Sequence, residues 1–214
     1  RFTVGKVAYA LNGPGVNTWL TPEDGIAAAQ AGTGTGLGVA SAVSPRVVWI
    51  MPDTYTGPQG VVSLLPNVHL LGAAGHSGAV ILDSYALDFS AAGTISIRGI
   101  TFRNCSISAH PTSDTVLEFV ECEFVDCTWA TTNDDNPVTT YRFVRCNGNF
   151  TSHVDTLSAN ATISKQFEGG DSTYGSTATV APTSYGPSLN FGAVMQVAGV
   201  GGLAFITISG GQRM

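Results

Sequence analysis

Three segments of the chain repeat the same alternation of apolar residues, and this repeat constrains the fold more strongly than any other feature. They cover residues 95–105, 117–127 and 141–146, so the pattern returns after 22 and then after 24 residues. The matching positions are Ile95, Leu117 and Tyr141; Ile97, Phe119 and Phe143; Ile100, Cys122 and Cys146; Phe102 and Phe124; and Cys105 and Cys127. A period in the twenties is typical of a β-solenoid, because each coil buries its inward side chains only when the next coil stacks on it. We therefore expect stacked parallel coils.

The composition fits a β-rich shaft. The 214 residues are enough for one domain with a sizeable core. Only 11% of the residues are charged, so polarity comes mainly from hydroxyl and amide side chains. The net charge of −6 argues against nucleic-acid binding. Because no apolar run reaches about 18 residues, we expect no insertion into a membrane.

All four cysteines lie inside the repeats, mostly at inward positions: Cys105, Cys122, Cys127 and Cys146. Two disulfides or a metal site are one interpretation, and a buried stack of small apolar thiols is the other. We expect the stack, with no metal and no cofactor, since the chain has neither a C-x-x-C pair nor zinc-ligand spacing. No signal peptide is recognisable at Arg1, which indicates a processed or truncated N-terminus.

Residues 1–45 are expected to hold a first strand around Val7 and Tyr9, a loop, and one short helix. Thr21 is suited to cap that helix, Pro22 to begin it and Gly32 to end it. Such a helix would cover the open end of a solenoid, where strand edges are unpaired. Further strands are predicted over 46–51, 61–62, 68–71 and 79–82, with a turn region over 52–58.

Residues 46–168 are predicted to form the solenoid, whose last, imperfect coil uses apolar residues between Val154 and Phe167. Residues 169–214 are predicted to be an extension containing a hairpin formed by 191–197 and 203–208. No charged residue occurs from Ser184 to Gly211. This segment is therefore expected to pack against its own shaft or against a neighbouring subunit.

Over residues 21–150 the chain resembles the pectin-lyase-like superfamily. The stretch 47–56 looks like the strand and Gly-x-Tyr element of that superfamily, with Asp53 in place of the usual Gly, and 66–72 looks like its Asn-Val-x-Leu-x-Gly element. The stretches 79–82 and 97–104 continue the likeness. The resemblance implies an all-β, right-handed, single-stranded parallel β-helix. Pectinesterases, pectate lyases, glycosidases, phage tailspikes and structural virion proteins share this shape, so it leaves the activity open.

The catalytic motif of pectinesterases is not recognisable. Segment 117–127 is similar to the rung that ends in Gln-Asp-Thr in those enzymes, but Cys127, Thr128 and Trp129 stand there in this chain, and residues 153–156 echo the motif only faintly. A glycosidase would need two carboxylates about 5 Å or about 6.5–9.5 Å apart, and stacked coils about 4.8 Å apart can provide either spacing. The candidate acids are Glu123, Asp126, Asp134, Asp135 and Asp155. For a lyase, Arg142, Arg145 and Lys165 are the available basic residues.

Structural interpretations compete with each of these. Glu118 aligns with Arg142, and Glu121 with Arg145, so charge pairs between neighbouring strands are expected. The loop containing Asp134 and Asp135 is either a turn or a site that binds Ca²⁺ or sugar. Trp129, expected at the edge of a coil, is the candidate for stacking on a sugar.

Two further residues are expected to have structural roles. Trp49 should lie in the core, and His69 should lie within its strand with its hydrogen-bonding groups satisfied.

Two classes of function follow. The first is a structural virion protein, such as a tail-fibre, tailspike or capsid-surface component, which is homo-oligomeric (as a trimer), meets other virion proteins and contacts host glycans. The second is a polysaccharide hydrolase or lyase, which would be either secreted or part of a virion. A non-enzymatic adhesin is a third alternative. We favour the structural role because the coils are few and the expected loops are short.

Overall fold

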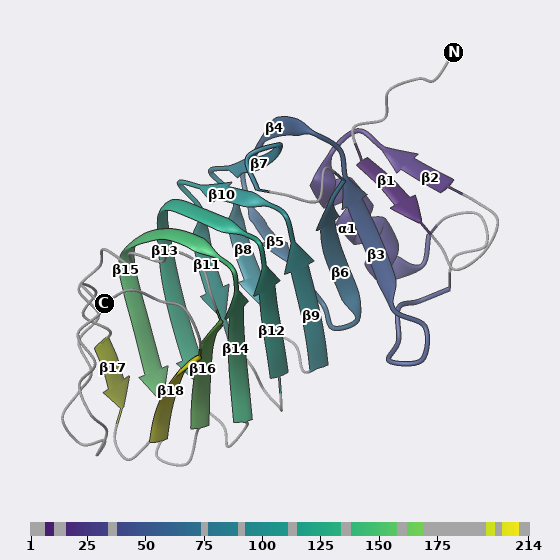
Figure 1. Cartoon of the computed structure of the whole chain (residues 1–214). Helices are drawn as coiled ribbons and strands as arrows, with labels where there is room; N and C mark the ends of the chain where they lie inside the picture. Colours follow the sequence, from purple (N-terminus) through teal and green to yellow (C-terminus); the bar gives the residue numbers. More distant parts are fainter. Residues whose placement is uncertain are drawn as a thin grey trace.

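The computed structural model describes residues 7–10, 16–33, 38–73, 77–89, 93–110, 115–133, 138–157, 162–168, 196–199 and 203–209. These residues form a right-handed parallel β-helix with one short helix near its N-terminal end (Figure 1). The predicted fold class is therefore confirmed. Within the described residues, no helix is both long and apolar enough to cross a membrane.

The first sheet forms one long side of the β-helix. Its parallel strands are β3 (Arg46–Ile50), β6 (Val68–Gly72), β9 (Gly93–Arg98), β12 (Thr115–Val120), β14 (Val138–Val144), β16 (Thr162–Glu168) and β18 (Leu203–Ser209). At its N-terminal edge β1 (Val7–Ala10) pairs antiparallel with β3 and with β2 (Val16–Trp19). Strand β1 was expected from the sequence, whereas β2 was not.

The second sheet bends around the remaining two sides. Its strands are β4 (Asp53–Thr56), β7 (Val80–Asp83), β10 (Thr101–Arg103), β13 (Glu123–Asn133), β11 (Ser106–Ala109), β8 (Ala86–Phe89) and β5 (Val61–Ser63). The long strand β13 pairs with β10 through its first residues and with β11 through its later ones, and β15 (Asn147–Leu157) pairs with β13. The predicted turn over 52–58 is wrong where β4 lies, because Tyr55 is buried and β4 pairs with β7.

Several coils turn at corners built on residues with left-handed backbone. The first corner, between the two sheets, contains Gly99, Glu121 and Arg145, and the second corner, inside the second sheet, contains Ser84, Asn104 and Asp126, all with φ between 50 and 64°. Non-glycine residues adopt this conformation at a cost of about 1–2 kcal/mol. Backbone bonds to the next coil offset that cost, as when Asn104 N–H donates to Val125 O at 2.9 Å.

The residue after each corner points into the core, which explains the sequence repeat. Ile100, Cys122 and Cys146 follow the first corner, and Tyr85, Cys105 and Cys127 follow the second. All four cysteines are buried and free, so the predicted stack of thiols is confirmed.

Aromatic side chains fill the centre of the coils. The rings of Phe102 and Phe124 stack at 5.4 Å between centroids, directly across neighbouring strands. Phe119 and Phe143 stack in the same way at 5.3 Å. These columns bury large apolar areas, at about 25 cal/mol for each Å² removed from water.

Helix α1 (Pro22–Ala31) covers the N-terminal end of the coils, as the sequence predicts (Figure 1). Thr21 Oγ1 accepts a hydrogen bond from Asp24 N–H at 3.3 Å, and Gly32 ends the helix with φ 66°. Two polar side chains on the helix form hydrogen bonds with the coils. Glu23 accepts from the Tyr85 hydroxyl at 2.8 Å, and the Gln30 side chain accepts from Leu65 N–H at 2.8 Å.

The C-terminal strands continue the solenoid. Strand β16 pairs with β14, so the predicted coil is present, although it is not the last one. Strand β17 (Gln196–Gly199) pairs in parallel with β15, and β18 pairs in parallel with β16. The predicted hairpin is therefore wrong, since these two strands add to the two sheets rather than to each other.

Candidate functional site

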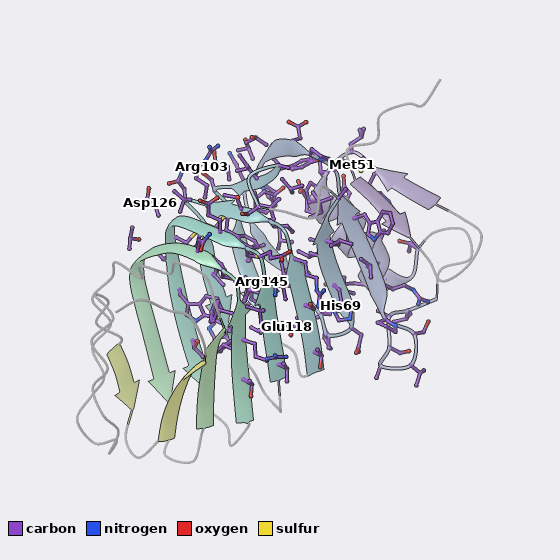
Figure 2. All side chains as sticks on the ribbon, viewed as in Figure 1. Met51, His69, Arg103, Glu118, Asp126 and Arg145 are labelled. Carbon is purple, nitrogen blue, oxygen red and sulfur yellow. The ribbon has the colours of Figure 1, made fainter. Side chains whose placement is uncertain are left out.

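The most ordered polar arrangement lies on the outer face of the first sheet. His69, Ser96, Glu118 and Arg142 occupy one outward column across β6, β9, β12 and β14, and are called the His69 row below. Outward residues alternate with the buried residues of each strand, which places them on the solvent side. Figure 2 shows His69 and Glu118 on this face.

Glu118 is the centre of the row. Its Oε2 accepts from Ser96 Oγ at 3.1 Å, and its Oε1 accepts from an Arg142 nitrogen at 2.8 Å. Arg98 lies 3.7 Å from the same carboxylate, whose side chain is only 18% exposed. With both oxygens engaged, Glu118 is held as an ion-pair partner rather than presented as a general base. The predicted ladder is confirmed here and at Arg145, which binds Glu121 at 2.7 Å.

His69 is also held in place. Its Nδ1 accepts from Ser96 N–H at 3.0 Å, which requires that nitrogen to be deprotonated. Partial burial lowers the pKa of His69 below its ordinary value. The Ser96 hydroxyl donates to Glu118 and not to His69, so the three residues do not form a nucleophile activated by an imidazole. The expectation of a satisfied strand histidine is confirmed.

A second cluster, which the sequence analysis did not identify, lies on β8 and β11. Asp88 Oδ1 accepts from Ser108 Oγ at 3.1 Å and contacts His110 Nδ1 at 3.1 Å. Both partners therefore share one carboxylate oxygen, and the hydroxyl is again bound to the acid instead of the imidazole. The sequence carries no signal for this cluster, because the pairing of Asp88 with Ser108 across neighbouring coils is seen only in the fold.

A third cluster lies at the second corner. Arg103 donates to Asp83 Oδ2 at 2.9 Å, and the Asn104 amide donates to Asp83 Oδ1 at 3.1 Å. The hydrogen bond from Arg103 is the main cause that lowers the pKa of Asp83. Like the His69 row, this cluster joins successive coils through a neutralised charge.

Of the five candidate acids, the structure places Glu123, Asp126 and Asp155. Glu123 lies in the part of β13 that follows the first corner and accepts from Thr101 Oγ1 at 3.1 Å. Asp126 is exposed at the second corner, near Arg103 in Figure 2. Asp155 lies on β15 opposite Thr131, beyond that corner. Asp134 and Asp135 lie outside the described residues.

The available basic residues lie elsewhere. Arg142 is on β14 in the first sheet and Arg145 is at the first corner, each paired with a glutamate. Of Lys165 the structure gives only its place on β16. Both arginines are thus engaged by glutamates other than Glu123.

Trp49 and Trp129 are exchanged relative to the predictions. Trp129 is 1% exposed, packs edge-on against Tyr141 at 5.1 Å, and donates its Nε1–H to Thr131. It cannot stack on a sugar, because alternation from Cys127 directs it inward. Trp49, predicted to be in the core, is 43% exposed on the outer face of β3.

No group of three or more His, Cys, Asp or Glu side chains able to hold a metal ion occurs within the part of the chain that the structure describes. Comparison of the chain with protein-family models, with curated proteins and with solved structures gives no match.

Proposed function

We propose that the protein is a structural, non-catalytic β-helix that forms part of a virion, as a tail-fibre, tailspike or capsid-surface component. This proposal rests on Glu118, because both of its carboxylate oxygens already accept hydrogen bonds, one from Ser96 and one from Arg142 on the neighbouring coils. This outward acid of the first sheet, whose side chain is 18% exposed, thus joins coils together. A catalytic acid would instead need an oxygen directed at a substrate.

The arrangement of the other charges supports the same role. Arg103 binds Asp83 and Arg145 binds Glu121, each pair crossing from one coil to the next. The low charged fraction of 11% leaves few ionic groups for a substrate cleft. The resemblance to the pectin-lyase-like superfamily is compatible with this class, which includes purely structural virion proteins.

We further propose that the protein is a homo-oligomer, as a trimer, and that residues 184–211 contribute to its subunit interface. This segment carries no charged side chain, which suits burial against a neighbouring copy. Other virion proteins and host glycans are the partners that such a shaft would meet.

The test compares the full chain with a chain that ends before Ser184, by size-exclusion chromatography with light scattering. The full chain is expected to be trimeric and the shortened chain monomeric, with retained β-sheet circular dichroism as the control for folding. A monomer in both cases would contradict the oligomer. Incubation of the full chain with a panel of neutral and acidic polysaccharides should release neither reducing ends nor unsaturated ends, and release of either would establish the alternative, a hydrolase or a lyase.

A further inference from the structure

The four cysteines form two columns along the β-helix axis. On either side of Cys105 and Cys127 the strands keep one register, since Arg103 pairs with Val125 and Ser106 pairs with Thr128. Cys105 therefore stacks directly against Cys127 in the next coil, after the second corner.

The other two cysteines stack in the same way after the first corner. Val120 pairs with Val144, and Glu123 pairs with Asn147, so Cys122 faces Cys146 across one coil. Asn147 N–H donates to Cys122 O at 3.0 Å, which fixes the two coils against each other at this point.

The cysteines of each column lie in register, and each thiol donates to a carbonyl oxygen of the preceding coil. Cys105 donates to Leu82 O at 3.2 Å and Cys127 to Phe102 O at 3.3 Å. Cys122 donates to Ile97 O at 3.5 Å and Cys146 to Phe119 O at 3.3 Å. All four side chains are at most 2% exposed. Burial raises the pKa of Cys122. The neighbouring Cys105 and burial raise the pKa of Cys127, whereas Cys127 lowers the pKa of Cys105. Cys122 and Cys127 are therefore held as thiols in the folded protein.

Only one of the three connectivities that four cysteines allow agrees with this geometry. Cys122 directly follows the first corner and Cys127 directly follows the second, five residues further along the same coil, so the two columns lie at different corners. Within each stacked pair, the two cysteines are one coil spacing apart, about 4.8 Å. This spacing lies inside the usual Cα separation of about 4.4–6.8 Å for a disulfide. The Cβ atoms need to approach by a few tenths of an ångström to reach their usual separation of about 3.5–4.5 Å.

We propose that these two columns are oxidation sites, at which exchange with a small-molecule disulfide such as oxidised glutathione forms the bridges Cys105–Cys127 and Cys122–Cys146. In each pair one cysteine thiolate attacks the small disulfide, which gives a mixed disulfide and releases one glutathione thiolate. The second cysteine thiolate attacks the mixed disulfide at the cysteine sulfur and releases the second glutathione. Two electrons pass from the cysteines to the reagent, and the two cysteine protons end on the released thiolates.

As a consequence, one coil would be linked by disulfides to both of its neighbouring coils. The coil that contains β12 and β13 holds both Cys122 and Cys127, so one bridge joins it to the preceding coil and the other to the following coil. The bridges would join cysteines that are 22 and 24 positions apart in the sequence. Loops of this size restrict the unfolded chain enough to raise the midpoint of thermal unfolding by roughly 5–10 °C per bridge.

The experiment begins with the reduced chain, which is placed in oxidised glutathione both in its folded state and during refolding from denaturant, because buried thiols react when coils open. After alkylation of remaining thiols, intact mass should show the loss of four hydrogen atoms in at least one of the two arms. Digestion with trypsin and with a protease that cuts after glutamate separates all four cysteines, since cleavage sites follow Arg103, Glu118, Glu121, Glu123, Arg142 and Arg145. The expected linked peptides contain Cys105 with Cys127 and Cys122 with Cys146.

Three variants separate the effect of a disulfide bridge from the effect of changed core packing, because the oxidised form of each variant is compared with its own reduced form. C105A/C127A keeps one column and should show about half of the wild-type shift in the thermal midpoint on oxidation. C122A/C146A should show the same half shift. C105A/C122A, which breaks both columns, should show no shift in the thermal midpoint on oxidation. Unchanged mass in both arms, glutathione adducts without internal bridges, other pairings, or an equal shift in C105A/C122A would each overturn the proposal.

Discussion

Phe119 and Phe143 stack across two successive coils with ring centroids 5.3 Å apart and ring planes 10° from parallel. Phe119 is 0% exposed and lies at the centre of the core. The other rings that surround it belong to Phe89, Phe102, Phe124 and Trp129. One side chain thus connects both sheets and several coils, and its removal leaves a cavity that rigid stacked strands cannot easily close.

We expect Phe119→Ala to lower the free energy of unfolding by about 3–5 kcal/mol, through lost burial and the residual cavity. Phe119→Leu, which keeps most of the volume, should cost about 1–2 kcal/mol. Urea unfolding followed by circular dichroism measures both. A loss below about 1 kcal/mol for the alanine variant would show that the coils do collapse around the gap, contrary to the rigid stacking.

The Glu118–Arg142 pair should show a measurable coupling. The two side chains are 18% and 37% exposed, so water and salt screen their attraction. A double-mutant cycle of Glu118→Gln, Arg142→Gln and the double variant should give a coupling of about 0.5–1 kcal/mol at low ionic strength. The coupling should decline when salt is raised to about 1 M. A coupling of zero at low salt would mean that the 2.8 Å contact adds nothing to joining the coils.

The sequence predicted the coils well because their inward residues repeat in kind. The register of Phe102 with Phe124, and of Leu117 with Tyr141, follows from the repeat alone. Strand β4 was missed because Pro52 and Asp53 are turn formers, while pairing with β7 and burial of Tyr55 override that local preference. The supposed hairpin failed for a related reason. Alternation identifies a strand but not its partner, and β17 and β18 pair with β15 and β16.

The outer face was less predictable. Aligning the repeats gave the Glu118–Arg142 pair, since each belongs to a matched segment. The cluster of Asp88, Ser108 and His110 was not found, because β8 lies before the first recognised repeat and its register with β11 requires the fold. Trp129 was misplaced because the left-handed corner at Asp126 interrupts the alternation, so the inward side has to be counted from Cys127 and not from the residues before the corner.

Gly72 is expected to tolerate no side chain, although its backbone is ordinary. A Cβ atom at this position would lie 2.2 Å from the carbonyl oxygen of Gly99, one coil further on. Gly72→Ala should therefore force the two coils apart at the first corner and lower the free energy of unfolding by about 1–3 kcal/mol. Gly60→Ala is the matched control, because its Cβ would meet nothing within 4 Å. Equal unfolding free energies for the two variants would contradict the close approach of these coils.

His69 should make the stability of the protein depend on pH near neutrality. Burial lowers its pKa in the folded protein below the ordinary value of 6.5, so the unfolded chain binds the proton more readily. The stabilisation is therefore complete above pH 6.5 and is lost as the pH falls through the folded value. Protonation of Nδ1 would also remove the acceptor for Ser96 N–H.

The variant His69→Gln tests this directly, because the glutamine amide can accept the bond from Ser96 N–H but does not titrate. Unfolding free energies measured in urea at intervals between pH 8 and pH 5 should fall for the wild type and fall less for the variant. Titration of the His69 ring protons by NMR in the folded protein should give a pKa below 6.5. Parallel pH profiles for the two proteins, or a ring that titrates above that value, would mean that the His69 row does not hold this imidazole neutral.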